Sequence, residues 1–192
     1  FDTSLHQDRS TFMRILFVNQ HSGSATAPLA SAALVSALER QFGSAVQCGI
    51  IEPPPEFDVS ALARDITALK PDLIALTLYV WSRIRLLELA SELLINPENR
   101  NLICIAGGPE VTADAAAIQA HPHVHLAVAG EGEEAVTAII SALLPHSPDR
   151  RVIELAASSP GGVFHGFATL AQLIELSGSE TLELPRGQMR DW

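Results

Sequence analysis

The chain has 192 residues, a length that suits one domain with an appended segment, and 47% of them are hydrophobic, enough for a full core. Its formal net charge of -10 at pH 7 disfavours binding to nucleic acid or to an anionic membrane surface. No apolar run approaches the roughly 20 residues of a membrane-spanning helix, and no signal-peptide pattern is present, so we expect a cytoplasmic protein.

Apolar segments of strand length alternate with segments of helical periodicity from Met13 onward. The expected strands are residues 14–19, 45–52, 72–79, 101–106 and 124–129. The expected helices are residues 28–41, 59–69, 82–94, 112–120 and 133–144. Five successive strand–helix units imply a parallel sheet with right-handed crossovers. We therefore predict an α/β fold, a flavodoxin-like (Rossmann-like) doubly wound five-stranded parallel sheet of order 2-1-3-4-5, with a short irregular C-terminal extension.

The flanks of this pattern differ from it in composition. Residues 1–12 are polar and aperiodic, and we interpret them as a tag or a disordered extension. The alternating pattern defines a domain over residues 13–145, and residues 146–192 have the irregular composition of a connector. Cys48 and Cys104 fall inside expected strands, which indicates small core side chains rather than a disulfide or a metal site.

Ligands of open α/β sheets bind outside the carboxyl ends of the strands. Here the loops at that edge are residues 19–27, 79–83, 107–111 and 130–133. Gly107 and Gly108 end an apolar strand and precede Pro109 and Glu110. Two adjacent glycines permit a sharp turn and a close approach, either by a ligand or by another backbone segment. We favour approach by a ligand.

A second glycine turn reads Gly130-Glu-Gly-Glu-Glu-Ala and matches the dinucleotide pattern G-x-G-x-x-A. That fingerprint belongs after the first strand, whereas this turn follows the fifth. Glu131, Glu133 and Glu134 would also repel a pyrophosphate at the helix N-terminus. The pattern therefore favours a tight turn with acidic residues, which remains compatible with a neutral or amide-bearing ligand.

Aromatic and histidine side chains give further candidates. Tyr79 and Trp81 lie two apart, so strand alternation predicts that they share one side, where they would stack on a flat ligand ring or simply pack. His21 lies in a Gly/Ser loop, and solvation is favoured over axial ligation of a metal. The cluster His121, His123 and His125 spans a helix-to-strand turn on the opposite edge, where surface histidines are favoured over a metal site.

Several catalytic classes are excluded by the pattern. No Ser-His-Asp order, paired catalytic carboxylates or P-loop lysine appears. A phospho-receiver would need acidic residues after the first strand and an aspartate ending the third, where Asn19 and Thr77-Leu-Tyr79 stand. We predict no catalytic residue in this chain.

One ordered set of motifs carries a family resemblance: Tyr79-Val-Trp81, Gly107-Gly-Pro-Glu110-Val111, His121-Pro122 and Gly130-Glu-Gly-Glu133. This set resembles the cobalamin-binding domain that precedes the catalytic core in cobalamin-dependent radical-SAM enzymes of the magnesium-protoporphyrin ester cyclase and methyltransferase type. The likeness covers about residues 13–144. It implies that residues 146–192 lead toward a radical-SAM domain of the same polypeptide.

The resemblance also implies a cofactor site. Cobalamin would place its nucleotide tail among the strand ends and its corrin against the aromatic loop. The cofactor-binding residues that it implies are Thr77, Tyr79, Val80, Trp81, Gly107, Gly108, Pro109, Glu110, Val111, Gly130, Glu131 and Gly132. In the whole protein cobalamin would carry a methyl group or assist a radical step, with S-adenosylmethionine and a [4Fe-4S] cluster outside this chain.

Two departures from the family pattern limit what the chain does alone. The cluster motif C-x-x-x-C-x-x-C is absent, so we expect no turnover by this chain. The signature D-x-H-x-x-G is replaced by Asn19-x-His21-x-x-Ser24, which implies a cobalamin bound without a histidine ligand. Two alternatives stay open: a degenerate scaffold or interaction domain without a cofactor, and a flavin or nucleotide binder, against which the acidic glycine turn weighs.

Overall fold

The computed structural model describes residues 12–20, 22 and 28–144. Its centre is a parallel sheet of order β2-β1-β3-β4-β5. The strands are β1 (Met13–Val18), β2 (Val46–Ile51), β3 (Leu73–Thr77), β4 (Ile103–Gly107) and β5 (Leu126–Val128). This architecture confirms the predicted fold class, strand order and direction.

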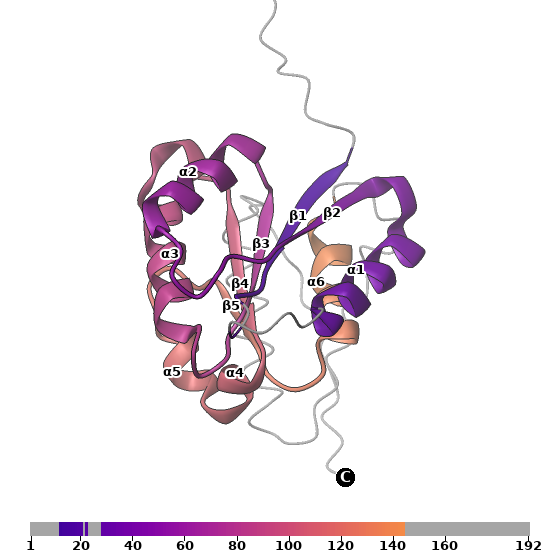
Figure 1. Ribbon diagram of the computed structural model, residues 1–192. Helices are drawn as coiled ribbons and strands as arrows, with labels where there is room; N and C mark the ends of the chain where they lie inside the picture. Colours follow the sequence, from indigo (N-terminus) through magenta and orange to yellow (C-terminus); the bar gives the residue numbers. More distant parts are fainter. Residues whose placement is uncertain (1–11, 21, 23–27, 145–192) are drawn as a thin grey trace, which may run out of the picture. The chain divides into compact units, whose positions relative to one another are not determined.

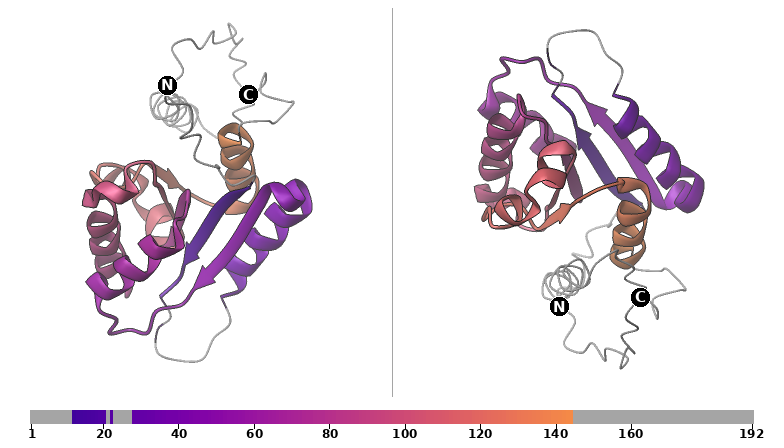
Figure 2. Two further views of the ribbon diagram at one scale, coloured as in Figure 1. Left: turned by 90° about the horizontal axis from the view of Figure 1, so that it is seen from above. Right: turned by 90° about the horizontal axis from the view of Figure 1, so that it is seen from below.

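Helices cover both faces of the sheet, as Figures 1 and 2 show. On one face α1 (Leu29–Phe42) packs against α6 (Gly132–Leu143). On the other face α2 (Val59–Leu69) packs against α3 (Arg83–Ile95), with α5 (Ala115–Gln119) beside β5. The remaining elements are α4 (Pro109–Ala113) and two 3-10 turns, Gly43–Ala45 and Pro97–Asn99.

The packing of the core explains why the sequences of the strands are continuous apolar runs. Leu73, Ile74, Ala75 and Leu76 of β3 are all buried, because helices lie on both sides of this central strand. A cluster of buried apolar residues fills the space between the sheet and the helices α2, α3 and α5. Cys104 of β4 belongs to this cluster and Cys48 of β2 is half-buried; both thiols are free, as the sequence predicts.

The predicted helix over residues 112–120 is wrong in detail. A helix begins earlier, at Pro109, whose fixed φ suits a first turn, and it ends at Ala113. Asp114 then leaves helical geometry at φ -150° and caps α5, since its Oδ1 accepts a hydrogen bond from Ala117 N at 3.0 Å. A capping side chain thus divides one predicted helix into two.

Some sequence predictions fall outside the described residues. They concern residues 1–11 of the proposed extension, His21, Ser24 and the whole connector after residue 145. The division into an extension, a domain over 13–145 and a connector stays a prediction. Among the residues that the structure does describe, none of the helices is long and apolar enough to cross a membrane.

Candidate functional site

The two glycine turns lie side by side at the carboxyl edge of the sheet. Gly107, the last residue of β4, pairs in register with Val128 of β5. The amide of Gly130 donates a hydrogen bond to Thr112 Oγ1 at 3.0 Å, and the same hydroxyl donates to Gly108 O at 3.3 Å. One side chain at the end of α4 therefore ties both turns together.

The tight contact at Gly108 comes from another backbone segment. Gly108 has φ +102°, and a Cβ there would lie 2.8 Å from Leu78 O and 3.3 Å from Thr77 Cγ2. Leu78 N donates to Gly107 O at 2.7 Å, and Glu110 N donates to Leu78 O at 3.2 Å. Of the two readings open in the sequence, approach by a backbone segment accounts for Gly108. Approach by a ligand at this turn stays a prediction.

The second turn is more open. Gly130 has φ +85°, and a Cβ placed on it would meet no atom within 4 Å. Gly132 begins α6, and a Cβ placed on it would lie 3.4 Å from Leu34 Cδ2 of α1. Glu131, Glu133 and Glu134 line a surface pocket of about 460 Å³ at this end of α6. The turn thus combines free space, a left-handed glycine and negative charge.

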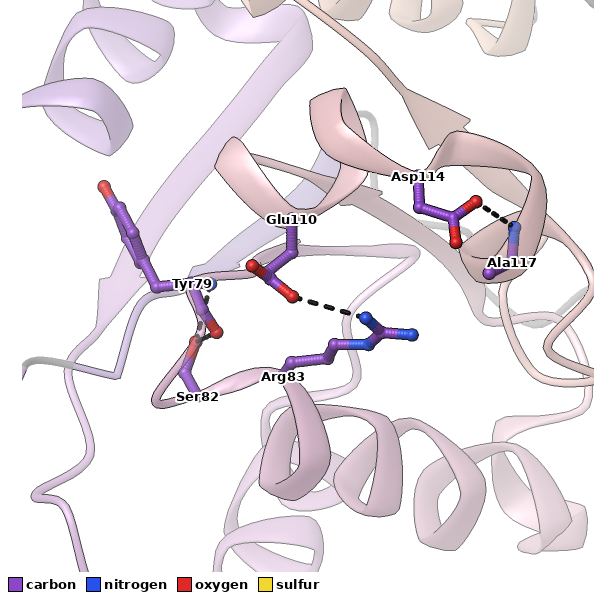
Figure 3. A network of polar contacts seen from close by, with 6 residues as sticks. All are labelled: Tyr79, Ser82, Arg83, Glu110, Asp114 and Ala117. Carbon is purple, nitrogen blue, oxygen red and sulfur yellow. Dashed lines mark hydrogen bonds and ion pairs between the residues drawn. The ribbon is translucent and has the colours of Figure 1, made fainter.

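Glu110 of the first turn is engaged within the protein. Its Oε2 forms an ion pair with Arg83 Nη1 at 3.3 Å, drawn in Figure 3. Arg83 begins α3 and Glu110 lies in the first turn of α4, so the pair connects the two helix starts that follow β3 and β4. Because both side chains are partly exposed, at 37% and 23%, the pair contributes more to loop geometry than to stability.

Tyr79 and Trp81 form a stacked pair in the loop after β3. Their ring centroids are 4.7 Å apart with an interplanar angle of 3°. The predicted shared side is therefore confirmed, but its stated reason is wrong, because β3 ends at Thr77 and the residues occupy a turn. Ser82 Oγ closes that turn by accepting a hydrogen bond from Tyr79 N at 3.0 Å. Val80 and Trp81 remain 75% and 50% exposed.

The sequence pattern gives no reason to single out Gln20. It follows Asn19 after β1 and is 3% exposed. Its main-chain carbonyl accepts a hydrogen bond from Trp81 Nε1 at 3.2 Å, and its Nε2 donates to Pro55 O at 2.7 Å. A buried glutamine directly after a strand leaves no distinct sequence signal, since the same residue type is usually exposed.

His121, His123 and His125 lie at the edge of the sheet opposite the glycine turns. They are not simply on the surface, contrary to the sequence prediction. All three are half-buried, and His125 Nδ1 accepts a hydrogen bond from Cys104 N at 2.9 Å. Burial, and then the charge of His123, lowers the pKa of His121. Among the described residues no group of three or more His, Cys, Asp or Glu side chains is placed to hold a metal ion.

Taken together, these features define a doubly wound α/β binding domain whose candidate site lies at the carboxyl ends of its strands. Residues 15–140 match the B12 binding domain family, and the chain belongs to that family. This finding confirms the resemblance stated from the motifs, and the family implies cobalamin as the ligand.

Two curated relatives are similar to shorter stretches of the chain. The cobalamin-dependent radical SAM methyltransferase TokK of Streptomyces tokunonensis is 33% identical over 81 residues, which are 42% of this chain and 12% of that protein. A 2-(S-pantetheinyl)-carbapenam-3-carboxylate methyltransferase of Streptantibioticus cattleyicolor is 35% identical over 92 residues, 47% of this chain and 13% of that protein. The match thus covers a small part of either relative.

The described residues fit cobalamin in three respects. Exposed Val80 and Trp81 give an apolar surface for a flat ring at the edge where ligands of such sheets bind. The space over Gly130 admits a bulky group close to the backbone. The neighbouring glutamates suit the neutral amide groups that surround a corrin better than they suit a polyanionic ligand.

Proposed function

We propose that this chain binds cobalamin at the carboxyl edge of its sheet and serves as the cofactor-bearing domain of a radical-SAM enzyme. The observation that carries the proposal is the joining of both glycine turns by Thr112, in the same rim as the stacked Tyr79 and Trp81. Methyl transfer or cyclase-type chemistry would belong to the full-length protein, with S-adenosylmethionine and an iron–sulfur cluster held in another domain. The chain alone would have no turnover.

Each part of the rim has a task in this proposal. Val80 and Trp81 offer the corrin an apolar surface that keeps water from the ring. The indole of Trp81 is held in place for this contact by its hydrogen bond to Gln20 O. Gly130 lets the cofactor approach the main chain, and the Arg83–Glu110 pair holds the two flanking loops at a set spacing. Bound cobalamin would supply a cobalt centre that carries a methyl group or supports a radical step.

The relatives support the enzyme class without defining the reaction. Both are methyltransferases by name, and one is named as cobalamin-dependent and radical SAM. Membership of the B12 binding domain family supports the cofactor independently of them. The radical-SAM partner domain, the substrate and a cytoplasmic location stay proposals for the whole protein.

A binding experiment on the full chain tests the cofactor. Hydroxocobalamin is mixed with the protein, and the pair is passed over a sizing column with detection of corrin absorbance. We expect co-elution at one cobalamin per chain for the wild type. Trp81→Ala should weaken co-elution, since this change removes one of the two exposed apolar side chains of the loop, Val80 and Trp81.

A matched control is Ile95→Ala. Like Trp81, Ile95 is an exposed apolar residue, with 68% exposure. It is the last residue of α3, whereas Trp81 lies just before the first, so Ile95 is at the far end of the helix from the proposed site and this change should leave co-elution intact. If the wild type has the far-ultraviolet circular dichroism spectrum of a folded α/β protein and still retains no corrin, the scaffold alternative would be favoured. Quenching of tryptophan emission by FMN but not by cobalamin would favour a flavin binder.

The absorption spectrum of the complex tests the axial ligand. The replacement of the D-x-H-x-x-G signature predicts that His21 does not coordinate cobalt. His21→Ala should then leave the visible spectrum of the bound cofactor unchanged. A shift of that spectrum in the variant would show that the histidine is a ligand after all.

A further inference from the structure

Gln20 connects three neighbouring loops at the carboxyl edge of the sheet. It lies in the loop after β1, its side chain reaches Pro55 O after β2 at 2.7 Å, and its main-chain carbonyl receives Trp81 Nε1 after β3 at 3.2 Å. These strands are adjacent in the order β2-β1-β3. The side-chain bond to Pro55 therefore fixes the backbone that holds the indole.

The fold itself gives little reason for an amide at this position. Gln20 is 3% exposed, and among the described residues its Oε1 is buried without a hydrogen-bond partner. An unsatisfied buried acceptor is destabilising and offsets the bond that the same amide makes through Nε2. Replacing Gln20 with methionine, which has a similar length, would remove both the stabilising bond of Nε2 and the destabilising buried Oε1. The net contribution of this amide to stability is therefore small.

The indole, in contrast, depends on Gln20. Trp81 is half exposed, and among the described residues its ring bonds to Gln20 O and stacks on Tyr79. Loss of the first would leave the ring free to turn on Tyr79. A ring that is ordered before the ligand arrives costs less conformational entropy on binding.

We infer that Gln20 is a positioning residue for cobalamin binding: by tying the loop after β1 to Pro55, it orients the Trp81 indole before the corrin docks. This inference rests on the proposed function, because it takes cobalamin as the ligand. Gln20 itself makes no contact with the cofactor in this proposal and acts only through Trp81. Gln20 occupies a position that the family motifs leave unspecified.

The test is a double-mutant cycle in a Trp192→Phe background, where Trp81 is the remaining tryptophan. The variants are Gln20→Met, Trp81→Phe and the pair together. Each single change should weaken hydroxocobalamin binding by about tenfold, the upper value for one neutral hydrogen bond. The double variant should bind within about twofold of Trp81→Phe, because Gln20→Met acts only through the bond from Trp81 Nε1 to Gln20 O, which Trp81→Phe already removes.

Two further readouts separate positioning from a structural role. Gln20→Met should shift the emission of Trp81 and weaken the near-ultraviolet signal of the stacked pair in the free protein, while its Tm stays within about 3 °C of the parent. Gln41→Met, which changes an exposed glutamine of α1, is the matched control and should change none of these quantities.

The outcomes are distinct. Additive losses in the double variant, or a large fall in Tm with unchanged Trp81 emission, would overturn the positioning role while the proposed function stands. A wild type that binds no hydroxocobalamin would overturn both. An unchanged affinity in Gln20→Met would also reject the inference, whatever Trp81→Phe does.

Discussion

The amide of Gly130 and the hydroxyl of Thr112 are joined by a hydrogen bond of 3.0 Å, across 18 residues of sequence. The same hydroxyl of Thr112 donates a hydrogen bond to Gly108 O at 3.3 Å, so two turns at the ends of neighbouring strands are held together as one unit. A cofactor that touches either turn therefore meets a surface whose two halves are held at a set distance.

Thr112→Val tests this connection. The change keeps the shape of the side chain and removes the hydroxyl, so both hydrogen bonds are lost. Because Thr112 is exposed and water replaces part of the interaction, we expect unfolding free energy to fall by about 1 kcal/mol in urea titrations. Cobalamin affinity should fall several-fold. Thr112→Ser restores the hydroxyl and should recover most of both losses; equal behaviour of the two variants would contradict the role of the hydroxyl.

The two left-handed glycines predict different costs for the same substitution. Gly108→Ala adds strain at φ +102° and a Cβ 2.8 Å from Leu78 O, so we expect a loss of about 3 kcal/mol or more. Gly130→Ala adds strain at φ +85° but meets no neighbouring atom, so about 1 kcal/mol is expected. Urea unfolding measures both, and a cost for Gly130→Ala equal to that for Gly108→Ala would contradict the packing of Leu78 against Gly108.

The half-buried His125 predicts a loss of stability in acid. Burial is the main cause that lowers the pKa of His125 below the ordinary value of 6.5, and the charge of His123 lowers it further. A lowered folded pKa means that the unfolded chain binds the proton more readily. The contribution of His125 is therefore complete above about pH 6.5 and is lost as the pH falls below that value toward the folded pKa.

Urea unfolding at several pH values measures this effect. In His125→Asn the side-chain oxygen can still accept the hydrogen bond from Cys104 N, but it does not titrate. The slope of stability against pH below 6.5 should be reduced in this variant and unchanged in a surface control such as Glu98→Gln. An identical slope in His125→Asn and the wild type would assign the acid sensitivity to other groups.

The thiols predict slow chemical modification of the native protein. Burial raises the pKa of Cys104 to about 12, and burial together with Glu39 raises the pKa of Cys48 to about 11. Since the thiolate is the reactive form, a disulfide reagent at pH 8 should label neither thiol quickly in the folded state. Both should react in denaturant, and Cys48 should precede Cys104 when the native protein is incubated for longer. Rapid reaction of Cys104 would show that the core around β4 opens readily.

Much of the fold could be predicted because it depends on patterns within short segments. The first four residues of β3, Leu73 to Leu76, are apolar at every position, since helices cover both faces of the sheet. The prolines and glycines between such runs mark where elements end. Handedness and connection rules then leave few arrangements for five strand–helix units. The family motifs likewise lie within short segments, so the sequence by itself determined the fold class, the strand order and the cofactor class.

The tertiary structure alone decided what each candidate residue touches. Trp81 and Gln20 are 61 residues apart, and His125 and Cys104 are 21 apart, so neither bond follows from local periodicity. Gly108 requires a glycine because Leu78, from the preceding strand's loop, occupies the space where its Cβ would lie. Such contacts depend on the distances between packed elements, which one-dimensional patterns do not contain, and for that reason Gln20 became visible as a candidate only when the loops after β1, β2 and β3 were seen together.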